Sequence, residues 1–229
     1  MTSFSGFPKG CIPYLKRLAR NNERAWFNEN KPRYEDCVRE PALAFIEAMG
    51  PEIGKLSPHF RAIPKKVGGS LMRVYRDTRF ARDKTPYKTN IGIQFRHELG
   101  KDVHAPGFYV HIEPGNSFIG AGIWHPESKV LTRIREFIAD NPHAWKQAST
   151  NRAFKKDFAF VGGMLKRPPR GFSADHELIS DLKRKDFIAC KNFDDTEILS
   201  RAFVHFVFRA FKRADPLMSY LCMAVDAQY

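Results

Sequence analysis

Residues 91–124, IGIQFRHELGKDVHAPGFYVHIEPGNSFIGAGIW, contain three short segments in which apolar residues occupy every second position. The segments are 91–97, 108–112 and 118–124. Since successive side chains of a β-strand point to opposite faces, this alternation predicts three strands that share one apolar face. That face would be made of Ile91, Ile93, Phe95, Phe108, Val110, Ile112, Ile119, Ala121 and Ile123. We expect it to pack against helices.

The opposite face of the same three strands is unusual for a surface that meets only water. It would carry polar, aromatic and glycine residues, namely Gln94, Arg96, Tyr109, His111, Gly120, Gly122 and Trp124. Glycine inside a strand weakens it and often marks close approach by a ligand or by another backbone. The pattern therefore predicts a groove on this face. Its floor would be Gly120 and Gly122, and its walls would be Tyr109, His111 and Trp124.

Helical periodicity dominates both ends of the chain. Apolar residues recur at helical spacing between residues 12 and 49, and again between residues 198 and 224. Gly50-Pro51 and Asp215-Pro216 are predicted to interrupt these helices, because proline lacks the backbone N–H that a helix interior needs. The expected fold class is α+β. We expect a single domain over residues 1–229, with a central, mainly antiparallel sheet covered on one face by N- and C-terminal helices.

The most basic stretch, LMRVYRDTRFARDKTPYKT at residues 71–89, lies just before the first of these strands. Residues 71–76 are predicted to form a strand and the remainder a long connection. Arginine and lysine side chains bind carboxylate or phosphate, so we assign an anion-binding role to a set of cations here and in the next strand. The set is Arg73, Arg76, Arg79, Lys84, Lys88 and Arg96. The alternative is structural, with Asp77 and Asp83 pairing with nearby Arg79 and Arg82 to hold the loop.

Two residues on the predicted groove face are the candidates for catalysis, His111 and Tyr109. Imidazole titrates near neutral pH, so His111 is the candidate general base, and a structural hydrogen bond is its alternative role. No serine or cysteine lies in a nucleophile elbow, and no glycine run has the spacing of a phosphate-binding loop. The nearby histidines and Glu113 lack a diagnostic metal-ligand spacing. We therefore predict neither a metal nor a cofactor.

The composition is that of a basic globular protein of 229 residues with a formal net charge of +13. Residues 61–101 hold eleven Lys or Arg against three acids, and residues 146–191 hold eleven against five. Such blocks attract an anionic small molecule or nucleic acid, and solvated surface charge is the simpler alternative. No helix-turn-helix, zinc-finger or RNA-recognition signature accompanies them.

Cysteine spacing and hydropathy predict the cellular location. Cys11, Cys37, Cys190 and Cys222 stand far apart, which fits reduced thiols rather than a zinc ribbon or a redox pair. The sequence has no signal-peptide core and no apolar run of membrane-spanning length. We expect a cytoplasmic protein without membrane contact.

Five short motifs stand out in order along the chain. They are NNER with Trp26-Phe27 at residues 21–27, YRDTRFARDKTPYKT at 75–89, AP with FY and His111 at 105–111, GAG with Trp124 at 120–124, and KR with GF at 166–172. This set resembles the domain of unknown function 2461 family, which comprises uncharacterised bacterial and fungal proteins. The resemblance implies one family-wide domain and carries over no catalytic residue.

These features leave three functions open. The first is a cytosolic protein whose sheet carries a groove for phosphate or carboxylate, and it includes an enzyme acting on a phosphorylated or acidic substrate. The second is a non-catalytic nucleic-acid-binding module that uses both basic blocks. The third is an interaction protein whose basic faces meet acidic partners.

Overall fold

The computed structural model describes residues 4–100 and 105–229. Its strands are β1 (Phe60–Arg61), β2 (Ile91–His97), β3 (Gly107–Ile112), β4 (Phe118–Ile123), β5 (Ala159–Val161) and β6 (Phe187–Asn192). Its helices before the sheet are α1 (Cys11–Arg20), α2 (Arg24–Glu29), α3 (Lys31–Tyr34), the π-helical η1 (Glu35–Arg39) and α4 (Glu40–Leu56). The later helices are α5 (Ser128–Asp140), α6 (Pro142–Thr150), α7 (Arg152–Asp157), α8 (Ile179–Leu182), the 3-10 helix η2 (Glu197–Leu199) and α9 (Phe203–Ala224).

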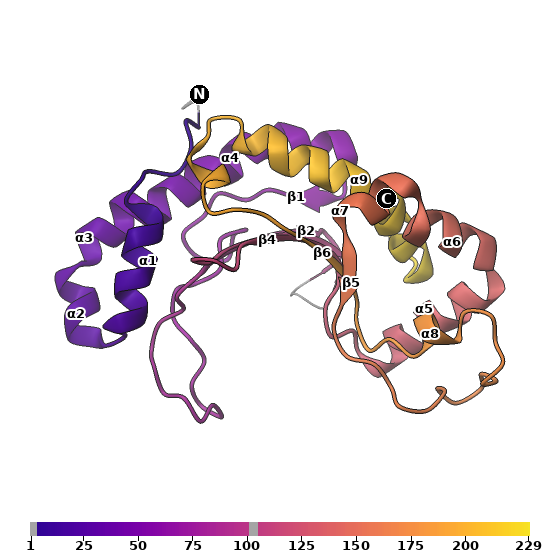
Figure 1. The fold of residues 1–229 in the computed structure, drawn as a ribbon. Helices are drawn as coiled ribbons and strands as arrows, with labels where there is room; N and C mark the ends of the chain where they lie inside the picture. The colour runs from indigo at the N-terminus through magenta and orange to yellow at the C-terminus, as the bar shows by residue number, and fades with distance from the viewer. Residues whose placement is uncertain (1–3, 101–104) are drawn as a thin grey trace.

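In the described part of the chain, six strands form one antiparallel sheet in the order β1-β2-β3-β4-β6-β5. The sheet bends into an arch, and α4 and α9 lie along its convex side (Figure 1). Ile93, Val110 and Ile119 stand opposite one another in β2, β3 and β4. The register therefore aligns the apolar positions of the three predicted strands on one face, and the predicted α+β class with helices over one face is confirmed.

Hydrophobic packing on the convex face explains this arrangement. All nine residues predicted for the apolar face are at most 2% exposed. Phe108 of β3 places its ring 4.6 Å from that of Phe211 of α9, and Phe95 of β2 contacts the rings of Phe45 and Phe211. Burial of one such side chain contributes about 1.5–3 kcal/mol. The core thus lies between the sheet and helices α4 and α9.

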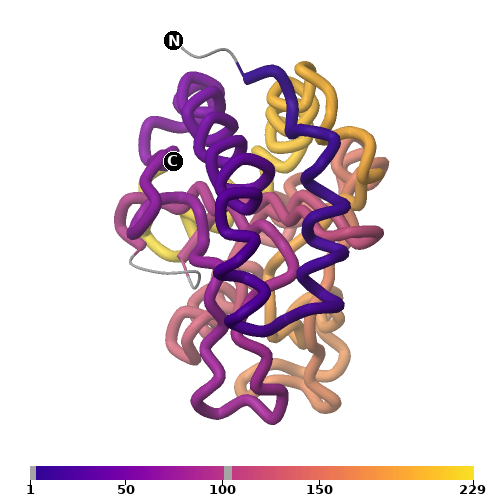
Figure 2. Tube along the Cα trace, turned by 90° about the vertical axis from the view of Figure 1, so that its left-hand side faces the viewer, coloured from indigo at the N-terminus to yellow at the C-terminus, as the bar shows by residue number. Residues whose placement is uncertain are grey.

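The two ends of the arch extend below the sheet and flank its concave side (Figures 1 and 2). At one end lie α1, α2 and α3 with residues 71–90, which we name the basic loop. The side chain of Asn22 fastens this loop, because its amide donates to Tyr87 O at 2.9 Å and accepts from Tyr87 N at 3.0 Å. The Tyr87 ring also stacks on Phe27 at 4.0 Å. At the other end lie α5, α6 and α8 with the 162–178 segment.

Both prolines predicted to interrupt helices lie inside them, so those predictions were wrong. Pro51 lies within α4 and Pro216 within α9. An interior proline costs about 3 kcal/mol. After Pro216 the helix buries Leu217, Met218 and Leu221, each fully covered, and each such burial contributes about 1.5–3 kcal/mol. Packing against the sheet and its neighbours therefore outweighs the missing hydrogen bond.

The strand predicted for residues 71–76 is also absent. The segment makes two isolated bridges, Leu71 with Ile93 and Tyr75 with Tyr87. Leu71 and Tyr75 are four residues apart, whereas their partners Ile93 and Tyr87 are six residues apart. The two bridges therefore do not share one register. The two additional residues lie between Tyr87 and Ile93, so a bulge separates the two bridges and no regular ladder forms.

No helix among the described residues combines the length and the apolar character needed to cross a bilayer. All four cysteines are free thiols. Cys11 and Cys222 are buried, and Cys37 and Cys190 are half-buried. Burial raises the pKa of the Cys190 thiol to about 11, so this group is protonated at neutral pH.

Candidate functional site

The concave face of the sheet holds a pocket with a volume of about 530 Å³. Residues from five strands, from the end of β4 and from the basic loop line it: Met72, Gln94, Gly107, Tyr109, His111, Phe118, Gly122, Trp124, Val161, Ile188, Cys190 and Asn192. Most of this lining is apolar or aromatic, with two amides and the Tyr109–His111 pair as its polar groups. Tyr109, His111, Gly122 and Trp124 were all placed on this face from the sequence.

Glycine allows close backbone approach at two positions of the concave face. A Cβ on Gly92 would lie 2.7 Å from the Tyr109 hydroxyl, so glycine leaves room for this side chain. Gly122 has φ +136°, and a Cβ there would lie 2.0 Å from the carbonyl oxygen of Phe187. Gly120 differs, because a Cβ there would only make ordinary contacts of 3.6 Å with Tyr109 and Ile188. It lies beneath these side chains and is not part of the pocket lining.

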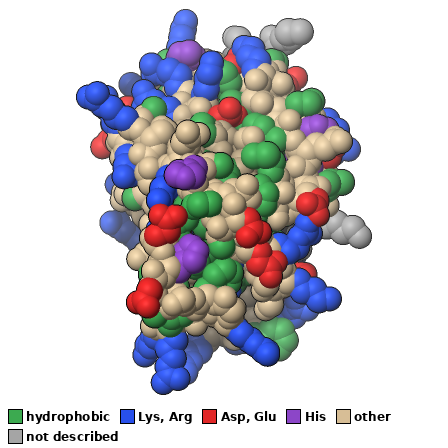
Figure 3. Space-filling model, turned by 90° about the vertical axis from the view of Figure 1, so that its right-hand side faces the viewer, with side chains coloured by type: hydrophobic (Ala, Val, Ile, Leu, Met, Phe, Trp, Pro, Cys, Tyr) green, Lys and Arg blue, Asp and Glu red, His purple; other side chains and the backbone are tan. Residues whose placement is uncertain are grey.

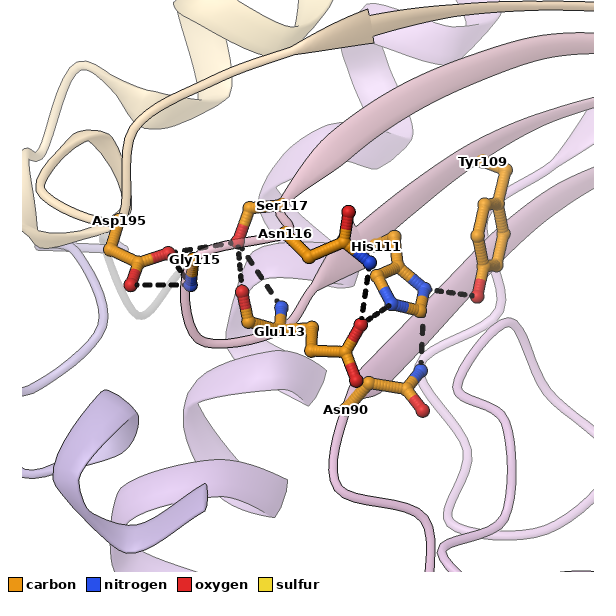
Figure 4. Close-up of polar contacts among 8 residues, drawn as sticks. All are labelled: Asn90, Tyr109, His111, Glu113, Gly115, Asn116, Ser117 and Asp195. Carbon is orange, nitrogen blue, oxygen red and sulfur yellow. Dashed lines mark hydrogen bonds and ion pairs between the residues drawn. The ribbon is translucent and has the colours of Figure 1, made fainter. Parts of the chain in front are cut away.

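A chain of polar contacts runs along one end of the pocket, from Tyr109 through His111 to Glu113 (Figure 4). The Nδ1 of His111 lies 3.1 Å from the Tyr109 hydroxyl and 3.4 Å from Nδ2 of Asn90. Its Nε2 lies 3.3 Å from Oε2 of Glu113. The Phe118 ring stacks on the imidazole at 4.6 Å. The ring is thus held on both nitrogens and on one face.

The turn between β3 and β4 positions Glu113. Asn116 donates to Oε2 of Glu113 at 2.8 Å, and the Ser117 hydroxyl accepts from the Glu113 backbone N–H at 3.1 Å. Asp195, which follows β6, accepts from the Gly115 N–H at 2.9 Å and lies 3.2 Å from the Ser117 hydroxyl. Figure 4 shows this network extending away from His111 toward Asp195. It restrains the carboxylate that contacts His111.

Burial sets the protonation states of the Tyr109–His111 pair. Burial raises the pKa of Tyr109 to about 12, and the nearby Glu113 charge adds to this. Burial lowers the pKa of His111, against the opposing effect of Glu113. At neutral pH the tyrosine is therefore a phenol and the histidine a neutral imidazole. With Nε2–H donating to Glu113, the lone pair of Nδ1 accepts a hydrogen bond from the Tyr109 hydroxyl.

Three of the six cations of the basic loop are held by partners within the loop itself. Arg76 donates to Asp83 Oδ2 at 2.5 Å and to the Thr85 hydroxyl. Arg79 forms a paired contact with Asp77, through Nε at 3.0 Å and Nη2 at 2.7 Å. Lys84 donates to the carbonyl of Thr78 at 2.8 Å. These contacts agree with the alternative in which Asp77 and Asp83 hold the loop by ion pairs. Asp77 pairs with Arg79 as expected, whereas Asp83 pairs with Arg76 and not with Arg82.

Arg73 and Lys88 are different from these three. Among the described residues, neither has a hydrogen bond or an ion pair through its side chain. Burial lowers the pKa of the Lys88 ammonium, and the positive charge of Arg73 acts in the same direction. The structure therefore brings two cations together. Lys88 is half-buried, and the charge of Arg73 also acts on Asp77, whose carboxylate is paired with Arg79. Arg96 lies farther along β2, where its guanidinium reaches the Gly68 carbonyl at 3.5 Å.

The second basic block does not form a continuous positive face. In Figure 3, Lys and Arg gather near the upper and lower margins of the side that carries α5, α6 and α8, and acidic side chains lie among them across the middle. Lys146 pairs with Glu177 at 2.5 Å, and Arg184 pairs with Asp181 at 2.9 Å. Much of this block is thus balanced locally.

Several lining residues were missed from the sequence because only the strand register and the loop path bring them here. Ile188, Cys190 and Asn192 belong to β6, which pairs with β4 across a sequence separation of about seventy residues. Met72 and Asn90 reach the site through the path of the basic loop. The apolar run at residues 187–190 was the available sequence signal for β6, and it does not name a partner strand. Within the described residues, no three His, Cys, Asp or Glu side chains gather as a metal site.

Comparison with known proteins agrees with the motif order described above. Residues 10–220 match the family described as conserved hypothetical protein (DUF2461). No curated protein and no solved structure shows significant similarity to the chain. Since the match covers nearly all of its length, this chain belongs to the DUF2461 family.

Proposed function

We propose that the concave face binds a small organic anion and transfers a proton to or from it. The apolar body of the ligand fills the pocket, its acidic group meets Lys88 and Arg73, and His111 exchanges the proton. The observation that carries this proposal is the half-buried Lys88, on the segment that borders the pocket. Lys88 lies near Arg73, and its ammonium has no hydrogen bond or ion pair among the described residues. Phosphate and carboxylate are both suitable acidic groups.

Successive side chains of the basic loop near Tyr87 point to opposite sides, and this supports a Lys88 side chain directed away from α2. Tyr75 and Tyr87 form a bridged pair, and Tyr87 faces Phe27 of α2. Lys88 follows Tyr87, so its side chain points to the other side. Asn90 lies two residues farther along the chain, and its amide contacts His111. The segment that carries Lys88 therefore leads directly to the pocket, and we infer that the ammonium group reaches it.

The lining supports an apolar and planar body for the ligand. Ligand pockets in proteins are commonly lined by apolar and aromatic side chains, with a few polar groups that set orientation. Here Phe118, Trp124 and Ile188 supply apolar surface, and the amides of Gln94 and Asn192 supply donors and acceptors. A free inorganic anion would use none of these surfaces.

The protonation states support His111 as the base and Tyr109 as the group that passes the proton. A phenol with a pKa of about 12 is ionised to only about one part in 10⁵ at pH 7. Tyr109 can still accept a proton from the ligand while it gives its own to Nδ1 of His111. The positive charge that develops on the imidazole is then stabilised by Glu113.

The binding test uses 1-anilinonaphthalene-8-sulfonate, an anion with an aromatic body whose fluorescence rises on binding. We expect saturable binding to the folded protein, and Lys88→Gln or Arg73→Gln should weaken it about tenfold, which is about 1.4 kcal/mol. Arg79→Gln is the matched control, because it removes the same charge from the same loop where Asp77 already neutralises it. Equal affinity in all four proteins would refute the anion site.

The reaction test uses a panel of p-nitrophenyl phosphates and of p-nitrophenyl esters that carry a carboxylate. Any turnover found should fall about 10²- to 10⁴-fold in His111→Asn, as expected for the loss of a general base. Turnover that survives this change would remove His111 from the mechanism.

Nucleic acid is the second candidate, favoured by the net charge of +13. It predicts binding of a labelled single-stranded oligonucleotide that weakens steeply with salt. The internal pairing of Arg76 and Arg79 argues against it. Fluorescence anisotropy at 50 mM and 200 mM salt separates the two functions, because the pocket ligand depends on Lys88 far more than on salt.

A further inference from the structure

A second histidine–carboxylate pair lies at the rim of the pocket, in residues that the proposed function does not use. His125 follows Trp124, which lines the pocket, and the two rings lie 4.2 Å apart. The Nδ1 of His125 lies 2.7 Å from Oδ1 of Asp186. His111 pairs with Phe118 at the start of β4, and His125 lies just beyond the end of β4. At about 3.3 Å per residue, the two histidines are separated by about 20 Å along the strand.

Asp186 is a buried carboxylate with a small and well-defined set of donors. Its side chain is 2% exposed. Oδ1 accepts from the His125 backbone N–H at 2.9 Å, and Oδ2 accepts from the Gly163 N–H at 3.0 Å. A buried carboxylate needs such donors to offset its lost hydration. Because Asp186 can only accept when ionised, Nδ1 of His125 carries the proton. Nε2 has no partner in the part of the chain that the structure describes.

The backbone at His125 is held in an uncommon conformation. Its φ is +48°, a region that residues other than glycine adopt rarely and at a cost. This bend lets the backbone N–H and the ring of His125 reach the same oxygen of Asp186. If Asp186 served only to link this turn to Gly163, hydrogen bonds from the backbone N–H groups of His125 and Gly163 would be sufficient. The ring contact is additional, and 59% of the His125 side chain is exposed.

We propose that His125 and Asp186 form a second proton-transfer site, at the Trp124 end of the pocket. Nε2 takes a proton from an O–H or N–H group of a ligand whose planar part lies over Trp124. The ring becomes an imidazolium, Nδ1–H stays on Asp186, and the ionised carboxylate stabilises the new charge. The proton then leaves from Nε2 to water on the exposed side.

Acylation by diethyl pyrocarbonate at pH 7.5, followed by peptide mass mapping, tests the free Nε2 of His125. His205 is the internal reference, because it is exposed on α9 and has no side-chain partner among the described residues. We expect His125 to react at least fivefold faster than His205. Asp186→Asn, checked by circular dichroism, should bring the two rates within twofold. If His125 and His205 are acylated at equal rates in the unaltered protein, the proposed proton-transfer role of His125 and Asp186 is wrong. This outcome does not depend on whether Asp186→Asn folds.

Protection by 1-anilinonaphthalene-8-sulfonate tests the position at the pocket, and this arm rests on the proposed function. The bound probe should slow acylation of His125 at least threefold and leave His205 unchanged. If fluorescence shows that the probe binds but acylation of His125 is not slowed, His125 does not lie at the rim of the occupied pocket. If the probe does not bind, the proposed function fails, and the ratio of His125 to His205 still decides on the His125–Asp186 pair.

Discussion

The two faces of the central sheet come from the same residues taken alternately, yet they differ in what holds them. On the convex face, Phe108 and its neighbours are fully buried against α9. On the concave face, Tyr109 and His111 remain half-buried around a pocket and are held by hydrogen bonds. The comparison teaches that one face carries most of the stability of the fold, and the other leaves a pocket lined in part by polar groups.

The largest effect should come from a pair of changes at neighbouring positions. Phe108→Ala deletes a fully buried ring on the convex face and should reduce the free energy of unfolding by about 3–5 kcal/mol. Tyr109→Phe removes only a hydroxyl from the concave face and should cost about 1 kcal/mol. Urea denaturation of both variants measures the difference. Equal losses would show that the two faces contribute alike to stability.

A smaller effect is expected from the glycines of β4. Gly122→Ala places a Cβ 2.0 Å from the Phe187 carbonyl oxygen at a φ of +136°, and it should cost at least about 2 kcal/mol. Gly120→Ala makes only contacts of 3.6 Å and should cost less than about 1 kcal/mol. Thermal unfolding of the two variants compares them. A Gly120→Ala protein as unstable as Gly122→Ala would mean that the concave surface is packed more tightly than described.

The smallest expected effect is on the pH dependence of stability, which His111 of the concave face should influence. Burial lowers the pKa of His111 below its ordinary value of about 6.5, so the unfolded chain binds this proton more tightly than the folded protein does. His111 therefore lowers stability as pH falls below about 6.5, and the loss is complete below the folded-state pKa. His111→Gln should flatten the stability profile between pH 7.5 and 5 in urea denaturation. His205→Gln, on the exposed side of α9, should leave the profile unchanged.

The predictable part of the fold depended on local periodicity. The parity of residues 91–97, 108–112 and 118–124 assigned the nine buried residues correctly, because a pleated strand alternates its side chains whatever lies next to it. On the other face, Tyr109, His111, Gly122 and Trp124 line the pocket, whereas Gly120 and Arg96 do not. Helix ends were less predictable. Pro51 and Pro216 break a helix only when nothing offsets their cost, and here packing of the flanking residues does so.

The candidate site was predictable only where its residues share one strand pair. Tyr109 and His111 follow from β3 alone, and Gly122 and Trp124 from β4. The partners of the loop cations did not follow, because Arg76 could reach Asp77 or Asp83 equally well in sequence. The same limit applies to Asp186, which contacts His125 across sixty-one positions of chain.

The amino-acid sequence by itself determined which residues of β2, β3 and β4 face the helices and which face the concave side, since backbone geometry makes that choice one residue at a time. The tertiary structure alone decided which cations are neutralised, which remain without a counter-charge, and which carboxylate contacts each histidine. Those outcomes depend on distances of a few ångströms between segments far apart in the chain, and ion pairs form only when folding brings the charges that close.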